Sequence, residues 1–164
     1  MQKNKIGLIC GRFNPLHLGH TFLINKALLI TKKLYILIGS SQEEKTLKNP
    51  YSYQNRLSFF KSIYGEKIKK GIIKIQPIED INDPPNWVSH VLQHIPDKVD
   101  IYFAGSPLDS DLFQNKIPIV CNINRENNDF KSATYIRHLI QEGDTSWVNL
   151  VPEKVVKIIK GLGE

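Results

Sequence analysis

The sequence predicts an α/β fold: a doubly wound, Rossmann-like parallel sheet of five strands with helices on both faces. Two observations carry this prediction. Short apolar runs without period-two alternation recur along the chain, as is typical of strands buried on both faces. Stretches whose apolar residues recur at helical spacing separate these runs, and strands that alternate with helices favour a parallel sheet covered on both sides. No repeat, low-complexity segment or linker interrupts the pattern, so we expect a single domain over residues 1–164.

The apolar runs define five expected strands, at residues 6–10, 34–38, 72–75, 99–104 and 117–120. The helices between them are recognised by their capping residues and by their apolar faces. Their expected starting points, in chain order, are Leu18, Ser52, Pro84, Leu108, Ser132 and Pro152. The second helix is expected to stop at Gly65, because glycine disfavours a helix interior.

The composition narrows the class of protein. The net charge of +6 suits nucleic acid, an anionic surface or a polyanionic small substrate. The lysines are scattered without interleaved aromatic residues, so we expect a solvated basic face and no nucleic-acid partner. No run of about 18 apolar residues exists and the start lacks a signal-peptide core, which predicts a cytoplasmic protein without a membrane partner. Cys10 and Cys121 are expected as free thiols, and a homo-oligomer is compatible with the sequence.

The most informative stretch, residues 11–20, reads GRFNPLHLGH and joins the first strand to the first helix. Glycines in such a turn let the backbone approach a ligand, and the amino end of the helix offers N–H groups to an anion. Arg12 adds a cation, and His17 and His20 lie three residues apart, on one face of the first helical turn. A turn whose histidines only cap or pack is the alternative. The combination predicts a phosphate site.

The pattern G-R-F-x-P-x-H-x-G-H resembles the signature of the HxGH nucleotidyltransferase superfamily, whose members join a nucleotide to a phosphorylated acceptor. The resemblance implies that a set of catalytic side chains holds the triphosphate of ATP: Arg12, His17, His20 and Arg137. It also implies that Gly11 and Phe13 contact ATP. The implied cofactor is Mg²⁺, carried by the ATP phosphates, and no side chain is expected to hold a metal.

The segment from residue 39 to residue 56 narrows the subgroup. The runs GSSQ at 39–42, TLKNP at 46–50 and NR at 55–56 resemble the corresponding segment of the archaeal-type nicotinamide mononucleotide (NMN) adenylyltransferases. In isolation, Lys48 and Arg56 would be read as members of an ordinary solvated loop. The resemblance implies instead that both contact phosphate, Lys48 that of ATP and Arg56 that of NMN.

Residues 80–87 carry the second diagnostic stretch. The position of Trp87 is similar to that of the aromatic residue that stacks on the nicotinamide ring in this subgroup, and a planar cation over an indole is favourable. A tryptophan of the core is the alternative. The resemblance implies that Asp80 accepts hydrogen bonds from the same nucleotide. The subgroup commonly has an asparagine where this chain has Pro84, so Asn82 and Asn86 both stay open as the carboxamide contact.

Two later stretches complete the expected ATP site. Gly105 and Ser106 stand where the family has a Gly-Asn loop on the adenine side. The run SATYIR at 132–137 resembles the family's second signature, which implies that Ser132 and Thr134 hold the leaving phosphates together with Arg137.

Together the resemblances imply an enzyme that transfers AMP from ATP to NMN, giving NAD and pyrophosphate. The implied NMN contacts are Arg56, Asp80, Asn82, Trp87 and Arg125. The attacking phosphate has a second pKa of roughly 6, so no side-chain base is required. Two alternatives stay open: a sister enzyme acting on nicotinic acid mononucleotide, phosphopantetheine or flavin mononucleotide, and a non-catalytic nucleotide-binding domain. His90 and His94 are expected on a polar helix face, because their helix offers no third metal ligand.

Overall fold

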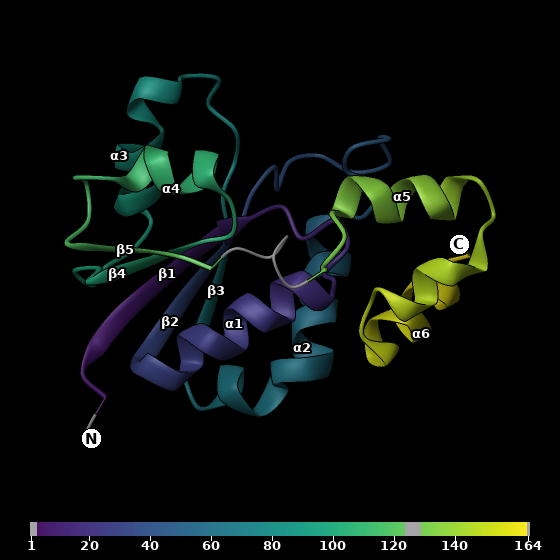
Figure 1. The fold of residues 1–164 in the computed structure, drawn as a ribbon, viewed down its shortest axis with the longest axis horizontal. Helices are drawn as coiled ribbons and strands as arrows, with labels where there is room; N and C mark the ends of the chain where they lie inside the picture. The colour runs from purple at the N-terminus through teal and green to yellow at the C-terminus, as the bar shows by residue number, and fades with distance from the viewer. Residues whose placement is uncertain (1–2, 124–128, 164) are drawn as a thin grey trace.

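Five parallel strands form one sheet in the computed structural model, which describes residues 3–123 and 129–163 (Figure 1). The strands are β1 (Lys5–Gly11), β2 (Thr31–Ile38), β3 (Ile73–Pro77), β4 (Ile101–Ala104) and β5 (Ile119–Asn122). Their order across the sheet is β3-β2-β1-β4-β5, and every neighbouring pair is parallel. The predicted fold class is confirmed.

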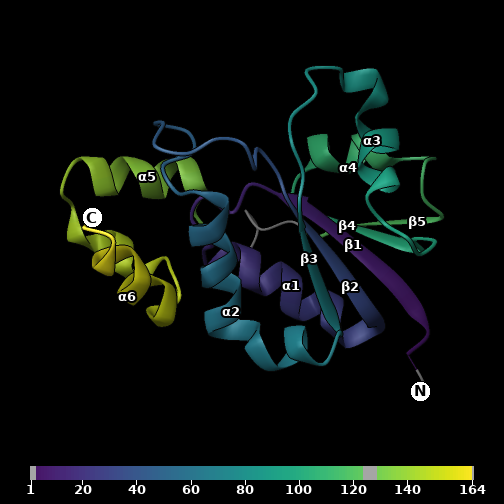
Figure 2. The same ribbon diagram turned by 180° about the vertical axis from the view of Figure 1, so that it is seen from behind.

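Helices cover both faces of this sheet, as Figures 1 and 2 show from opposite sides. They are α1 (Leu18–Ile30), α2 (Tyr53–Lys69), α3 (Trp87–Gln93), α4 (Pro107–Phe113), α5 (Ala133–Gln141) and α6 (Glu153–Gly161), with short 3₁₀ turns η1 (Pro84–Asn86) and η3 (Thr145–Asn149). One apolar core lies between the sheet and α1, α2, α5 and α6, and a second lies between the sheet and α3 and α4. The two cores explain why the central strands β1, β2 and β4 read as continuous apolar runs, because side chains on both of their faces are buried, whereas the edge strands β3 and β5 are partly exposed.

The predicted capping residues Ser52 and Ser132 are confirmed, because each accepts a hydrogen bond from a backbone N–H of the helix that follows. Ser106 also caps a helix, α4, which begins at Pro107, one residue before the predicted start at Leu108. The predicted stop at Gly65 lies next to an interruption within α2: the backbone at Tyr64 is not helical (φ −112°, ψ 18°), and a second helical stretch continues from this kink to Lys69. The Tyr64 side chain at the kink is buried in the larger core.

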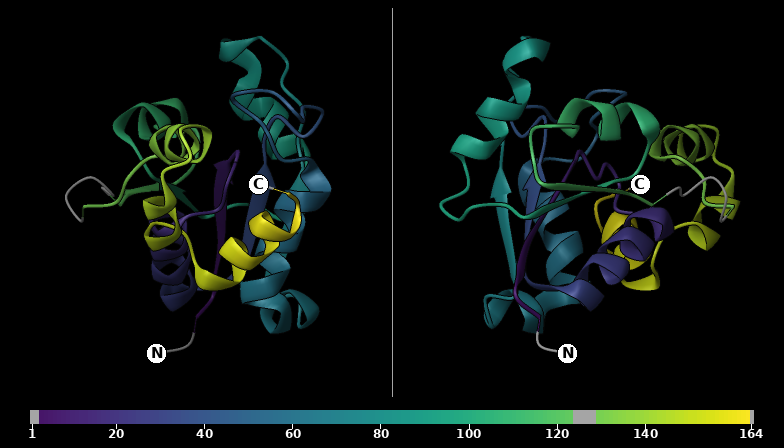
Figure 3. Two further views of the ribbon diagram at one scale, coloured as in Figure 1. Left: turned by 90° about the vertical axis from the view of Figure 1, so that its right-hand side faces the viewer. Right: turned by 60° about the vertical axis from the view of Figure 1, so that its left-hand side comes forward.

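The strand order reverses between β1 and β4, which makes this the topological switch point of the sheet. The chain builds β1, β2 and β3 outward on one side, then returns to place β4 on the other side of β1. In an open α/β sheet, ligands bind outside the carboxyl ends of the strands at this switch point. The end views in Figure 3 show α5 and α6 beside this region, opposite α3. No helix among the described residues is long and apolar enough to cross a membrane.

Candidate active site

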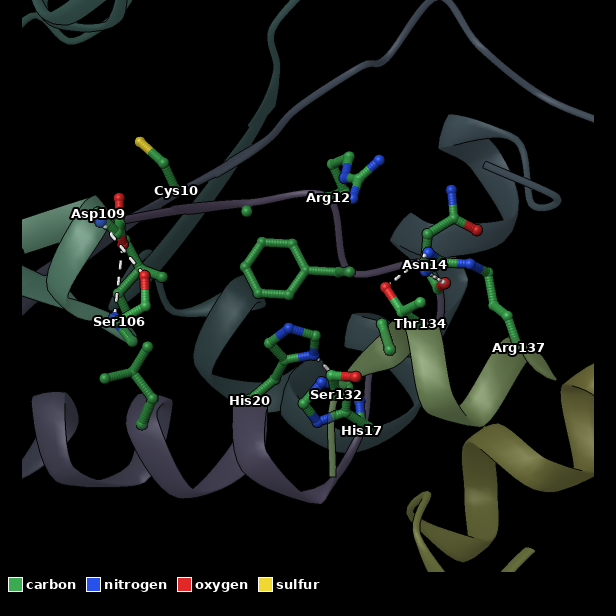
Figure 4. A pocket seen from close by; sticks show the side chains of 16 residues that line it. Cys10, Arg12, Asn14, His17, His20, Ser106, Asp109, Ser132, Thr134 and Arg137 are labelled. Atoms are coloured by element: carbon green, nitrogen blue, oxygen red, sulfur yellow. Dashed lines mark hydrogen bonds between the residues drawn. The ribbon is translucent and has the colours of Figure 1, made fainter. Parts of the chain in front are cut away.

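A cavity of about 310 Å³ lies at the carboxyl ends of β1 and β4, and we call it the motif cavity (Figure 4). It brings together ten of the residues that the sequence analysis predicted for ATP. They are Gly11, Arg12, Phe13, His17, His20, Gly105, Ser106, Ser132, Thr134 and Arg137. These residues come from three separate segments of the chain, 11–20, 105–106 and 132–137, and they meet at the switch point of the sheet.

His17 and His20 form a reciprocal cap at the start of α1. The backbone N–H of Gly19 donates to Nδ1 of His17 at 3.0 Å, and the backbone N–H of His17 donates to Nδ1 of His20 at 3.2 Å. Their rings stack with centroids 3.6 Å apart, and the His17 side chain is 2% exposed. Because Nδ1 accepts in both rings, each neutral imidazole carries its proton on Nε2. The cap therefore sets both histidines as donors through Nε2.

Close packing around the same turn explains two other residues of the motif. Phe13 adopts the left-handed φ of 51°, which is rare for a bulky side chain, and its ring packs edge-on against His20 at 4.7 Å between centroids. A Cβ at Gly19 would lie 2.9 Å from the His17 ring, so this position accepts only glycine without a shift of the ring. The turn is shaped around the stacked histidines.

Arg12 and Arg137 give the motif cavity its positive charge. Arg137 is 7% exposed and donates to the backbone oxygen of Asn14 at 2.9 Å and to Oγ1 of Thr134 at 3.2 Å. Burial, and then the like charge of Arg12, lower the pKa of Arg137. Neither arginine forms an ion pair with a carboxylate within the described residues. Guanidinium groups without a paired carboxylate are suited to an anionic ligand.

Asn14 joins the motif to the loop that follows β2. Its side-chain amide donates to Oδ1 of Asn49 and to the backbone oxygen of Tyr51, both at 3.3 Å, while its Oδ1 accepts from the Tyr51 N–H at 3.0 Å. Asn14 and Asn49 are both buried. Sequence reasoning missed this pair, although an asparagine inside the motif and a second one before Pro50 were visible signals.

Arg56 has a different place from the one predicted. The prediction of a phosphate contact is not supported, because the side chain is 0% exposed and its guanidinium donates only to backbone oxygens. Nη1 donates to Arg12 at 3.0 Å and Gly39 at 2.7 Å, Nη2 donates to Ser40 and Glu43, and Nε donates to Ser52. Burial, followed by the like charge of Arg12, lowers its pKa. Arg56 thus joins the ends of β1 and β2 to the start of α2 and is a positioning residue.

The predicted acceptor residues Asp80, Asn82 and Trp87 lie outside the motif cavity. They line a second cavity of about 290 Å³, which we call the tryptophan cavity, together with Ile81, Asp83, Pro84 and Leu112. A third cavity of about 210 Å³, the middle cavity, shares Asp80 and Trp87 with the tryptophan cavity. With the motif cavity it shares Cys10, Gly11, Arg12 and Asp109. The three cavities therefore adjoin one another along the carboxyl edge of the sheet, and together we call them the cleft.

The tryptophan cavity separates the two asparagines that the sequence left open. Asn82 lines the cavity, with a left-handed φ of 51°. Asn86 is not among the lining residues, and its amide donates to Oδ2 of Asp83 at 2.7 Å. The geometry favours Asn82 as a ligand contact. Lys48 is exposed on the loop after β2 and lines none of the three cavities. Arg125 lies outside the described residues.

Asp109 is a wall residue that sequence reasoning did not identify. Its carboxylate accepts from the Tyr102 hydroxyl at 2.6 Å and from the Gly105 N–H at 3.4 Å, and its own N–H donates to Ser106 at 3.2 Å. Burial, and then the Asp109 charge, raise the pKa of the neighbouring Cys10 well above its ordinary value. The thiol next to the cleft is thus held in its protonated form, and Cys10 and Cys121 are free, as predicted.

Metal ligation by protein side chains finds no support in the described part of the chain. No three side chains of the His, Cys, Asp or Glu type gather there at a spacing suited to a metal ion. His90 contacts the backbone oxygen of Glu79, and His94 contacts the backbone oxygen of His90, which agrees with the predicted polar helix face.

Similar proteins identify the family of this chain. A family model described as cytidylyltransferase-like matches residues 8–139. A nicotinamide-nucleotide adenylyltransferase of Saccharolobus solfataricus is 37% identical over 157 residues, which cover 93% of this chain and 88% of the relative. Another from Archaeoglobus fulgidus is 36% identical over 154 residues, with shares of 92% and 87%. The chain belongs to the archaeal-type nicotinamide-nucleotide adenylyltransferases.

This adenylyltransferase is therefore a nucleotidyltransferase, as its HxGH motif predicted. Its fold is also found in a bifunctional NMN adenylyltransferase/ADP ribose pyrophosphatase from Francisella tularensis, with a TM-score of 0.74 at 21% identity. That match covers 98% of this chain and 50% of the bifunctional chain, so the adenylyltransferase spans about half the length of that protein.

Replacing Arg56 by alanine is expected to destabilise the fold. The change removes the side-chain donor from five backbone oxygens, of which only those of Ser40 and Ser52 also accept from a backbone N–H of the described residues, and we expect a loss of about 3 kcal/mol in the free energy of unfolding. For a domain of this size that corresponds to a fall of about 10 °C in Tm, measured by circular dichroism. Lys61→Ala, at an exposed position of the same helix, is the control and should leave Tm unchanged. A fall of less than about 2 °C in Arg56→Ala would contradict the positioning role.

The mutual cap of His17 and His20 predicts a single tautomer for both rings at neutral pH. In long-range proton–nitrogen correlation spectra of the ¹⁵N-labelled protein, Nδ1 of each ring should resonate as an unprotonated nitrogen and Nε2 as a protonated one. His138, exposed on α5, provides an internal reference for an uncapped ring. A protonated Nδ1 in either ring of the pair would show that the cap does not form in solution.

Proposed function

We propose that this adenylyltransferase transfers the AMP group of ATP to the phosphate of NMN, forming NAD and pyrophosphate. The observation that carries the proposal is the row of adjoining cavities that forms the cleft. Stacked histidines and two arginines, which pair with no carboxylate of the described residues, line its motif end, and an aromatic, acidic cavity forms its other end. The archaeal relatives, named for this activity over most of their length, support the same reaction.

The motif cavity suits the triphosphate of ATP. We propose that Arg12, His17, His20 and Arg137 donate to its phosphate oxygens, with His20 nearest the transferred phosphorus. The capped tautomer supports these roles, because it sets Nε2–H of each histidine as a donor without a change of protonation. Lys48 is proposed to reach the phosphates from its exposed loop, and a lysine side chain is long enough and flexible enough for such a movement.

Other predicted ATP residues lie at the starts of α4 and α5. Ser106 and Ser132 cap α4 and α5, so their hydroxyls already accept hydrogen bonds from Asp109 and Tyr135. We propose that the adenosine contacts the backbone around Gly105 and Ser106. We also propose that Thr134 and the start of α5 contact the leaving phosphates, where backbone N–H groups at a helix start favour an anion. Gly11 and Phe13 are proposed to shape the floor beneath the nucleotide.

NMN has opposite charges at its two ends, and so does the rest of the cleft. We propose that its phosphate lies near Arg12, in the middle cavity, and that its pyridinium ring lies against Trp87 in the tryptophan cavity. A cationic ring over an indole is favourable, and Asp80 adds a negative charge beside it. Arg125 is kept as a proposed NMN contact from the sequence. Arg56 is not a direct contact in this proposal.

The chemistry needs alignment and charge stabilisation more than proton transfer. The attacking phosphate oxygen of NMN is already largely ionised at neutral pH, since the second pKa of a phosphate monoester is about 6. The cleft brings the oxygen in line with the α-phosphorus of ATP, and arginine and histidine donors stabilise the charge that moves onto pyrophosphate. Mg²⁺ is proposed to enter with ATP, since this ion keeps several water ligands and takes phosphate oxygens of the substrate as the others. A cytoplasmic location stays a prediction from the sequence.

The activity is tested by the products formed. Purified protein is incubated with ATP, Mg²⁺ and one acceptor at a time, namely NMN, nicotinic acid mononucleotide, flavin mononucleotide or phosphopantetheine. We expect pyrophosphate release with NMN and a dinucleotide with the mass of NAD, measured by a coupled assay and by mass spectrometry. Pyrophosphate release with another acceptor and none with NMN would overturn the proposal.

Removal of His20 tests the catalytic proposal. His20→Ala should lower kcat about 10²–10³-fold, the usual effect of losing one donor aimed at developing charge. It also removes a capping acceptor, which typically costs about 1 kcal/mol, so the fold should survive. Circular dichroism confirms folding, and steady-state kinetics measure kcat. His94→Ala is the control: its ring contacts the backbone oxygen of His90 and lines none of the three cavities, so this variant should keep wild-type kcat. Normal turnover in His20→Ala would remove this residue from the mechanism.

A further inference from the structure

The wall of the tryptophan cavity carries two carboxylates beside the indole. Asp80 and Asp83 both line this cavity, and no lysine, arginine or histidine is among its described lining residues. Neither aspartate forms an ion pair with a cation in the described part of the chain. The far end of the cleft is therefore negative, in contrast to the arginine-lined motif cavity.

Both carboxylates are held in place by neutral amides. Gln42 donates from Nε2 to Oδ2 of Asp80 at 3.0 Å and accepts from the Asp80 N–H at 3.4 Å. Asn86 donates from Nδ2 to Oδ2 of Asp83 at 2.7 Å. An amide partner orients a carboxylate without neutralising its charge. The two side chains thus present fixed negative charge and hydrogen-bond acceptors at the cavity wall.

The acceptor nucleotide can carry one of two substituents on its pyridinium ring. Nicotinamide mononucleotide has a neutral carboxamide, whose NH₂ group donates hydrogen bonds. Nicotinic acid mononucleotide has a carboxylate there, which is negative and only accepts. A wall of carboxylates can accept from the amide, but it repels the acid and offers it no donor. Specificity of this kind comes from a repulsive element directed against the competing ligand.

We propose that Asp80 and Asp83 are specificity-determining residues that make the acceptor site select nicotinamide mononucleotide and reject nicotinic acid mononucleotide. The inference rests on the proposed function and names the basis of substrate choice at the same site. The role of Asp83 is the new part of this proposal, because the sequence patterns indicated no role for this residue. Asn82, on the same wall, supplies an amide that can accept from or donate to the carboxamide.

The exposure of Asp80 and Asp83 limits how strongly they can discriminate between the two nucleotides. Asp80 and Asp83 are both exposed, so water and salt screen their charges. We expect kcat/KM for nicotinamide mononucleotide to exceed that for nicotinic acid mononucleotide by about tenfold or more at low ionic strength. The ratio should shrink as salt is added, because the repulsion acts through solvent.

The test measures kcat/KM for both nucleotides at saturating ATP and Mg²⁺ in the wild type, Asp80→Asn, Asp83→Asn and the double variant. Asparagine keeps the shape and an acceptor oxygen but removes the charge. We expect each single variant to lower the preference and the double variant to abolish most of it, chiefly by raising kcat/KM for the acid. Glu79→Gln is the matched control, because it removes the same charge from an adjacent residue that does not line the tryptophan cavity, and it should keep the wild-type ratio.

The outcomes separate this inference from the proposed function. Equal use of both nucleotides by the wild type, or an unchanged ratio in the double variant, overturns the role of the two aspartates while NAD formation still supports the proposed function. The same shift in Glu79→Gln as in Asp83→Asn would also overturn it, because general charge would then explain the preference. If neither nucleotide yields a dinucleotide, the proposed function fails and the inference fails with it.

Discussion

The buried guanidinium of Arg56 holds the carboxyl ends of β1 and β2 in one arrangement, and the cleft is built on those two ends. Strand ends leave backbone oxygens without ladder partners, and buried oxygens of this kind need donors. A guanidinium supplies five N–H groups in a rigid plane, which a lysine could not do. Its acceptors belong to Arg12, Gly39 and Ser40, which also line the motif or middle cavity, and to the loop and helix that follow. The positions of the groups that line the cleft therefore depend on the buried hydrogen bonds of Arg56.

This arrangement places positive charges close together at one end of the cleft. Arg12 lowers the pKa of both Arg56 and Arg137, so the charged form of each is disfavoured by its neighbour as well as by burial. Such like-charge crowding is unfavourable, and an anion bound between the guanidinium groups would relieve it. Perturbed groups of this type gather at functional sites for this reason. At the other end, Asp80 and Asp83 reverse the sign, so that the cleft is polarised along its length.

The histidine pair shows how one feature serves structure and chemistry together. Ordinary helices are capped by serine, threonine, aspartate or asparagine, and a reciprocal pair of histidines is an unusual choice. Here the cap uses Nδ1 of both rings, so the same hydrogen bonds that start α1 also set the tautomer. Gly19 is required because a side chain there would meet the His17 ring.

The sequence alone determined the fold class, the family and ten of the residues that line the motif cavity. Local signals were sufficient for these: apolar runs predict buried strands, serines and prolines mark helix starts, and the HxGH motif occupies one strand-to-helix turn. Ten predicted ATP residues meet in one cavity because the carboxyl ends of parallel strands share an edge. The predicted stop at Gly65 lies beside the kink at Tyr64, and the sequence did not indicate the second helical stretch that follows it to Lys69.

What only the tertiary structure decided depends on contacts between residues distant in the chain. An arginine reads the same in a sequence whether it meets phosphate or five backbone oxygens, so the role of Arg56 could not be assigned before its surroundings were known. The choice between Asn82 and Asn86 also required the structure, because Asn82 lines the cavity whereas Asn86 does not and donates its amide to Asp83. The acidic wall beside Trp87 likewise emerged only in three dimensions. The role of a charged side chain depends on its neighbours and on whether a ligand can reach it, and the fold decides both.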